Sequence, residues 1–222
     1  MSSVRDRLIE GGIRLLEVDG PQALNVRNVA TEIGTSTMAV YTHFDGIAGL
    51  LDAIADEVFA RFTHALTEVP ETEDPVADFF AMGVAYRGFA LANPQRYQLM
   101  FGISSHEAIS GNRTDLTVTG AATNRIDRAA SFEALRKAVR RMIAAGRIRG
   151  GGEPAIAGRL WSLIHGAVLL EMAGFFGHED RGLTEILGPL AIDVFVGMGD
   201  DRDRATLSML SASHSAVAVE TP

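Results

Sequence analysis

The chain has 222 residues, with 20 basic and 28 acidic side chains, no cysteine and 47% hydrophobic residues. This composition excludes a largely disordered chain, a disulfide framework and a thiolate metal site. The net charge of −8 argues against a protein that coats nucleic acid through general positive charge, and the polar N-terminus lacks a secretory signal, so we expect a cytoplasmic protein.

The first elements are short helices, because apolar residues recur at helical spacing and no alternating strand pattern persists. Asn25 stands where the second helix needs its N-cap, and Gly34 ends that helix. Ser36 stands at the N-cap of the third helix. We expect helices over residues 3–19, 26–33, 37–43 and 47–67.

The second half of the chain begins after a Pro-containing acidic linker, residues 69–75. Its helices are predicted over residues 79–90, 97–101, 121–146, 155–176 and 190–198, with a loop at 104–120. The 155–176 segment is apolar nearly all round, but it contains Arg159, His165 and Glu171. A helix buried between protein surfaces is therefore expected, and no membrane span. The tail, residues 200–222, is predicted to be flexible.

Three residues indicate a helix-turn-helix. Ala30, Gly34 and Val40 occupy positions 5, 9 and 15 of the twenty-residue stretch 26–45. A small residue lets the two helices cross closely, glycine suits the turn, and Val40 fixes the second helix on the first. We therefore expect an all-α protein with an N-terminal three-helix helix-turn-helix domain (1–50) and a C-terminal helical ligand-binding and dimerisation bundle (51–199), connected by helix 47–67.

The third helix has two different faces. At 100° per residue, Ala39, Val40 and Phe44 lie on one side. The opposite arc carries polar and aromatic groups, which suits insertion into the major groove of DNA. The residues of this arc are Thr37, Met38, Tyr41 and Thr42.

At this point the sequence resembles the TetR family of bacterial transcriptional regulators. The resemblance rests on Leu24-Asn25-Val26-Arg27-Asn28-Val29-Ala30 and on Met38-Ala39-Val40-Tyr41-Thr42-His43-Phe44, followed by a leucine-rich helix, and it covers residues 8–55. It implies phosphate contacts from Tyr41 and His43, anchoring of the neighbouring strand by Asn25 and Arg27, and base-edge contacts from Thr37, Met38 and Thr42. Ser36 completes the expected interface. Alternatively, Asn25 serves only as a cap and His43 only closes the helix.

One position departs from the family pattern. Ile47 stands where the family usually has a lysine that reaches a phosphate. Because each phosphate contact adds to affinity and to its salt dependence, we expect weak binding with a shallow salt dependence. The N-terminus of helix 47–67 could present amides to a phosphate, and Arg5 and Arg7 could reach the duplex if the N-terminal arm orders.

The most basic stretch, residues 125–149, carries a net charge of +6, whereas residues 1–50 carry −2. Arg136, Lys137, Arg140 and Arg141 share one face of an amphipathic helix. This face is either a second surface for DNA or an acidic partner, or a solvated face that balances nearby acidic helices, which is the commoner case. The family places this helix away from the DNA.

The C-terminal half resembles the TetR subgroup marked by a Trp-x-x-x-His-Gly motif, through Trp161-Ser162-Leu163-Ile164-His165-Gly166, Tyr86-Arg87-Gly88-Phe89-Ala90 and Asn93-Pro94-Gln95-Arg96-Tyr97. Trp161 and His165 either form ordinary core or contact a ligand. Aromatic and methionine side chains at helical spacing are also commonly plain core, but they are candidates to line an effector pocket. The candidate pocket residues are Phe79, Met82, Phe89, Tyr97, Met100, Phe101, Met142, Trp161 and His165.

The predicted function is a homodimeric repressor that binds a palindromic operator in double-stranded DNA and is released by an apolar small-molecule effector. The family resemblance places the dimer interface in helices 155–176 and 184–198. Two alternatives are a relative that has lost DNA binding and acts through a protein partner, and an enzyme on a helical bundle. The sequence contains no metal-spaced His/Glu set, nucleophile elbow or phosphate loop, so no cofactor, metal or catalytic residue is expected.

Overall fold

The computed structural model describes residues 2–102, 126–177 and 180–219, and in these ranges it contains helices and no strand. The predicted loop 104–120 and the start of the predicted helix 121–146 lie outside the described residues. The elements are α1 (Val4–Asp19), the 3₁₀ turn η1 (Pro21–Ala23), α2 (Val26–Glu32), α3 (Thr37–Phe44), α4 (Ile47–Thr67), α5 (Pro75–Ala92), α6 (Pro94–Met100), α7 (Ile126–Ala144), α8 (Glu153–Met172), the π-helical turn η3 (Gly182–Leu187), α9 (Gly188–Met198) and α10 (Arg202–Val219).

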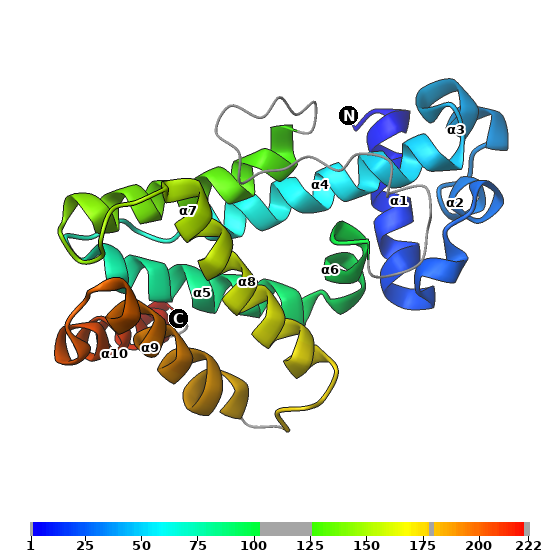
Figure 1. Cartoon of the computed structure of the whole chain (residues 1–222). Coiled ribbons are helices and arrows are strands. Elements are labelled where there is room, and N and C mark those ends of the chain that lie inside the picture. The colour runs from blue at the N-terminus through cyan, green and yellow to red at the C-terminus, as the bar shows by residue number, and fades with distance from the viewer. Residues whose placement is uncertain (1, 103–125, 178–179, 220–222) are drawn as a thin grey trace.

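Figure 1 shows α1, α2 and α3 gathered at one end of the molecule, with α4 running from them along the larger helical half. The first helix begins with a reciprocal cap, in which the Ser3 hydroxyl accepts from the Asp6 amide and the Asp6 carboxylate accepts from the Ser3 amide. Leu8, Ile13 and Leu16 of α1 are buried. They belong to the same apolar cluster as Val40 of α3 and Leu50 of α4.

The core of the N-terminal helices continues into the second half through α4. The cluster that contains Leu50 also contains Phe62 of α4, Tyr86 of α5, Tyr97 of α6 and Val168 of α8. The two halves therefore share one continuous core. A domain boundary at residue 50 stays a prediction.

A second apolar cluster lies between α5, α7, α8, α9 and α10. Phe79 and Phe80 of α5 both meet Phe195 of α9 edge to face, with ring centroids 5.2 and 5.7 Å apart. Val139 and Met142 of α7 are fully buried in the same cluster. Only one face of α7 joins this core, as its amphipathic sequence predicts.

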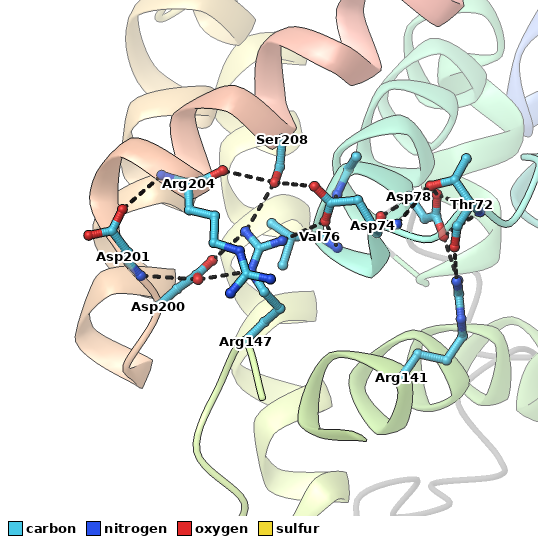
Figure 2. Close-up of polar contacts among 11 residues, drawn as sticks. Thr72, Asp74, Val76, Asp78, Arg141, Arg147, Asp200, Asp201, Arg204 and Ser208 are labelled. Carbon is cyan, nitrogen blue, oxygen red and sulfur yellow. Dashed lines mark hydrogen bonds and ion pairs between the residues drawn. The ribbon is translucent and has the colours of Figure 1, made fainter. Parts of the chain in front are cut away.

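The tail after residue 200 was predicted to be flexible, but its described residues form the helix α10 (Arg202–Val219). This helix packs along α5. Its inner face is held by a buried polar network, shown in Figure 2. The Arg147 guanidinium donates to both carboxylate oxygens of Asp200 (2.9 and 2.8 Å). It also donates to Asp74 Oδ1 (2.6 Å) and to Ser208 Oγ (3.0 Å). These partners lie 53 to 73 residues from Arg147 along the chain, so helical periodicity carries no sign of them.

Helix α8 is long and apolar enough to cross a membrane by length and composition. In the fold it packs against α5, α7 and η3, and Ile156, Leu160, Ile164 and Val168 are buried there. The fold buries a third of its apolar stretch (33%), so the expectation that the whole helix lies between protein surfaces stays a prediction.

Candidate nucleic-acid interface and effector region

The turn between α2 and α3 has the geometry of a helix-turn-helix. Gly34 adopts φ +68°, a left-handed conformation that disfavours any side chain, and the Thr35 amide donates to the Ala30 carbonyl at 2.9 Å. Ala30 is 2% exposed at the crossing of the two helices, and Val40 is fully buried. Each of the three residues therefore occupies the environment that its sequence position predicted.

The buried side of α3 leaves its other face exposed to solvent. Met38 is 67% and Tyr41 54% exposed, large values for side chains of this size. His43 is exposed as well, so it does not pack into the core at the end of the helix. All eight predicted DNA contacts are exposed: Asn25, Arg27, Ser36, Thr37, Met38, Tyr41, Thr42 and His43.

Some of these side chains already make local hydrogen bonds. The Asn25 side-chain oxygen Oδ1 accepts from the Asn28 backbone amide at 2.9 Å, which makes Asn25 the N-cap of α2. The Thr42 hydroxyl donates to the Met38 carbonyl at 2.9 Å, so it retains lone pairs that can accept. Ser36 takes the N-cap position of α3 without a side-chain hydrogen bond to the helix.

The start of α4 is set by glycines whose role the sequence did not reveal. A Cβ atom at Gly49 would lie 1.9 Å from the Phe44 carbonyl oxygen, so only glycine lets the first turn of α4 pass beneath the end of α3. Gly46 precedes α4 with φ +110°, and Ile47 is half-buried against the core. The close approach fixes the orientation of α3 relative to α4.

The electrostatic surroundings of α3 are more acidic than basic. A broad groove of ≈ 780 Å³ beside Tyr41, Thr42 and His43 is also lined by the acidic side chains of Asp45, Asp52, Asp56 and Glu57. The arginines of α1 are engaged within the domain. Arg5 lies over the Phe44 ring (5.3 Å to the centroid), and Arg7 donates to the Ile33 carbonyl at 2.8 Å. Both lie on an ordered helix, and no extended N-terminal arm is formed by these two residues.

The basic face of α7 is neutralised by acidic side chains of this chain. Arg136 bonds Glu153 at 2.6 Å, and Arg141 bonds Asp78 at 2.5 Å. The other two basic residues also have acidic partners, Arg140 with Glu133 and Lys137 with Glu71. The pairing favours the second interpretation of this stretch, a face that balances acidic neighbours.

The nine predicted effector residues do not converge on one site. Phe79 and Met142 belong to the cluster formed with α9 and α10. Trp161 packs against both clusters. The remaining members surround the core between α4, α5, α6 and α8: Met82, Phe89, Tyr97, Met100, Phe101 and His165.

Three polar groups meet inside this aromatic region. The Tyr97 hydroxyl lies 2.6 Å from His165 Nδ1 and 2.8 Å from the Tyr86 hydroxyl, which is itself 3.1 Å from the same nitrogen. Tyr97 is fully buried and Tyr86 is 5% exposed. The Trp161 indole N–H points to the Tyr86 hydroxyl at 3.4 Å. We call Tyr86, Tyr97 and His165 the Tyr–Tyr–His cluster.

Burial keeps the Tyr–Tyr–His cluster uncharged. It raises the pKa of Tyr86 to about 12 and raises the pKa of Tyr97 further, and it lowers the pKa of His165. A protonated tyrosine hydroxyl can then donate to the neutral imidazole nitrogen. The cluster therefore presents hydrogen-bonding groups without charge, which suits a neutral ligand better than an ion.

An ion pair links this region to the N-terminal helices. Arg96, adjacent to Tyr97 on α6, pairs with Glu17 on α1. The helix that carries a member of the Tyr–Tyr–His cluster is thus tied directly to the domain that carries α3.

Exposed apolar side chains lie on α8, on the segment that follows it and on α9. Leu170 is 47%, Phe175 74%, Ile186 39% and Leu190 43% exposed. Exposed apolar side chains of this size on neighbouring elements make this surface a candidate for contact with another molecule.

Two family models match the chain. Residues 8–54 match the model described as bacterial regulatory proteins, tetR family, and residues 79–188 match the tetracyclin repressor-like C-terminal domain. The uncharacterized HTH-type transcriptional regulator Rv0681 of Mycobacterium tuberculosis is 28% identical over 197 residues, covering 87% of this chain and 81% of the relative.

One further relative is named a transcriptional repressor, and one solved structure is similar over most of the chain. The HTH-type transcriptional repressor DrrR1 of Streptomyces coeruleorubidus is 38% identical over 53 residues, which are 24% of this chain and 20% of that protein. A solved structure of a protein of unknown function from Rhodococcus sp. RHA1 has a TM-score of 0.69 and 28% identity, covering 90% of this chain and 97% of the other.

Proposed function

The chain belongs to the tetR family of bacterial regulatory proteins and is a DNA-binding transcriptional regulator, and from this premise we propose that it acts as a homodimeric repressor. In this proposal the dimer binds a pseudo-palindromic operator, and a neutral small-molecule effector releases it.

The exposed face of α3 carries the proposal. A short helix with Val40 and Phe44 buried and Thr37, Met38 and Thr42 exposed can enter the major groove as a rigid unit. The Met38 side chain and the threonine methyl groups would meet thymine methyl groups, and the threonine hydroxyls would meet base edges. Tyr41, His43, Asn25, Arg27 and Ser36 surround this face and would bond phosphates.

The dimer interface is proposed on the exposed apolar side chains of α8, η3 and α9, which correspond to the segments 155–176 and 184–198. Leu170, Ile186 and Leu190 would be buried against the same residues of the partner, as in a two-fold symmetric contact. A dimer then holds two α3 helices for adjacent major grooves, which are about 34 Å apart.

The effector is proposed to bind beside the Tyr–Tyr–His cluster. A neutral molecule with a polar group would exchange hydrogen bonds with Tyr86, Tyr97 or His165, and the surrounding aromatic side chains would contact its apolar part. A shift of α6 on binding would act on α1 through Arg96 and Glu17 and so change the position of α3.

The experiment that tests the proposal selects random duplexes with the purified protein and then measures affinity by fluorescence anisotropy. Thr42→Ala and Tyr41→Phe are expected to weaken binding to the selected duplex by about 1–3 kcal/mol each, through lost base-edge and phosphate bonds. Thr67→Ala is the matched control, because Thr67 is an equally exposed helical threonine whose hydroxyl also bonds a carbonyl four residues back.

Enrichment of an inverted repeat and a selective loss in the two α3 variants support the proposal. A chain that enriches no duplex at low salt is the regulator relative that acts through a protein partner, and the repressor proposal then fails.

A further inference from the structure

An apolar cavity lies in the C-terminal half, between α5, α8, η3, α9 and α10. Its volume is ≈ 230 Å³. All five elements contribute residues to its lining, among them Phe79, Gly83, Ile164, Leu187, Ala191 and Met209. Thr184 is the one polar side chain in the lining. No charged side chain lines this cavity.

Two sets of ion pairs join the elements that line the cavity. At one end, Arg147 joins Asp200, which precedes α10, and Ser208 of α10 to Asp74, the N-cap of α5, as Figure 2 shows. At the other end, Arg87 of α5 bonds Glu171 of α8 (2.8 and 2.6 Å) and Asp180 ahead of η3 (2.8 Å). These ion pairs tie α5 to α10, to α8 and to the segment ahead of η3, which are elements that line the cavity.

Small residues create the space itself. Gly83 on α5 has no side chain, and a Cβ atom there would lie 3.5 Å from Ile164 Cδ1, an ordinary contact distance. Ala191 on α9 also lines the cavity and has a single methyl group as its side chain. The π-helical turn η3 supplies Leu183, Thr184 and Leu187, and π-helical turns occur often at functional sites.

The cavity is separate from the Tyr–Tyr–His cluster. Ile164 lines the cavity, while His165, the next residue of α8, bonds Tyr97. Successive residues of a helix point about 100° apart, so α8 presents its two sides to two different regions. A molecule in the cavity would contact α10, which contributes nothing to the Tyr–Tyr–His cluster.

We propose that this cavity is a second ligand site, which binds a small uncharged monocyclic aromatic molecule. A cavity of about 150 Å³ lined by Leu, Ile and Phe takes up benzene, and the space here is half as large again. Ions are excluded, because none of the lining groups could compensate their lost hydration. The Thr184 hydroxyl donates to the Asp180 carbonyl at 3.1 Å and keeps lone pairs, so it can accept from a phenolic hydroxyl at the cavity.

The test uses the full chain labelled with ¹³C at its methionine methyl groups, titrated with toluene, phenol and benzoate. Met209 lines the cavity, whereas Met82 and Met100 lie with the aromatic core around α6. Toluene and phenol are expected to shift the Met209 methyl resonance in a saturable way through the ring current, with Met100 unmoved. Benzoate is expected to leave Met209 unchanged at the same concentration.

Two variants of one helix separate cavity binding from general effects. Gly83→Leu fills the cavity and is expected to weaken toluene binding at least tenfold. Gly88→Leu makes the same change on α5 at an exposed position with open space around it, and it should leave binding within twofold of wild type. Ala191→Leu fills the cavity from α9 and keeps the test usable if Gly83→Leu fails to fold.

The proposal is overturned if toluene leaves Met209 unchanged, if it moves Met100 instead, or if Gly88→Leu weakens binding as much as the filling variants do. A Met209 resonance that responds to protein concentration and not to toluene would assign the cavity to a second copy of the chain, which also overturns it.

Discussion

Replacing Arg147 with methionine tests how α10 is held in the fold. Arg147 and the Asp200 side chain are each 2% exposed, and they share two hydrogen bonds. Methionine keeps the apolar stem but removes the charge and every donor. The Asp200 carboxylate would then stay buried without a cation, and Asp74 and Ser208 would each lose a partner.

The expected cost is about 3–5 kcal/mol of unfolding free energy, the usual result of removing one member of a buried ion pair. For a chain of this length each kcal/mol corresponds to about 2–4 °C, so the melting temperature should fall by roughly 6–20 °C. Urea unfolding followed by circular dichroism measures the change. Hydrogen exchange should rise first in α10, since its first turns lose their link to α5.

Arg149→Met is the matched control, two residues further along the same connection. Arg149 is exposed and donates to the Gly197 carbonyl at 2.6 Å, so its loss should cost less than about 1 kcal/mol. Adding Asp200→Asn to Arg147→Met should cost less than the sum of the two single changes, because the second change removes the charge left without a partner. An Arg147→Met protein within 1 kcal/mol of wild type would refute the reasoning.

Three further predictions concern other parts of the molecule. Ile47→Lys should strengthen operator binding and make the slope of log affinity against log salt concentration steeper by about 0.9 per subunit, as measured by anisotropy across a salt series. An unchanged slope would show that no phosphate lies near this position. Gly49→Ala should lower the unfolding free energy by about 1–3 kcal/mol, because the added methyl group would clash with the Phe44 carbonyl oxygen. Gly88→Ala, on an open helix face, should instead raise the unfolding free energy by about 0.5–1 kcal/mol, and equal effects of the two variants in urea unfolding would contradict this. Burial lowers the pKa of His165 below its ordinary value of 6.5, so the unfolded chain binds the proton more tightly and the unfolding free energy should fall as pH drops below 6.5. His165→Gln should flatten this part of the pH profile, whereas an unaltered profile would show that burial does not keep the imidazole neutral.

Local sequence patterns predicted the N-terminal helices well. The boundaries of α1, α2, α3 and α4 depend on local signals, namely caps, helix breakers and apolar spacing, which lie within a few residues of each boundary. The exposed face of α3 follows from helical geometry. Gly34 and Ala30 could be interpreted alone, because the turn and the crossing are local features. The constraint on Gly49 was missed, since it depends on how close Phe44 comes in space.

The C-terminal half was less predictable, because its decisive contacts join distant residues. The sequence of α10 has no clear apolar stripe, and its attachment depends on Arg147 and Asp200, which lie 53 positions apart. The predicted effector residues failed to form one set for a related reason. Apolar spacing identifies Phe79 and Met142 as buried, but it does not tell which of two clusters each of them joins.

The charge distribution was informative only once the partners were known. The stretch 125–149, with a net charge of +6, pairs with Glu71, Asp78 and Glu153 from outside the stretch, and Glu133 of α7 itself pairs with Arg136 and Arg140. The face proposed to read DNA carries mainly uncharged side chains. We therefore expect this chain, with its net charge of −8, to bind its proposed operator through hydrogen bonds and methyl contacts, with little help from long-range attraction.

Hydroxyl-radical footprinting of the complex on the selected duplex tests most directly whether a dimer reads DNA through two α3 helices. We expect two protected regions about one helical turn apart, related by the two-fold symmetry of the site, with both weakened together by Thr42→Ala. A single protected region, or protection that persists unchanged in the Thr42→Ala protein, would contradict the account.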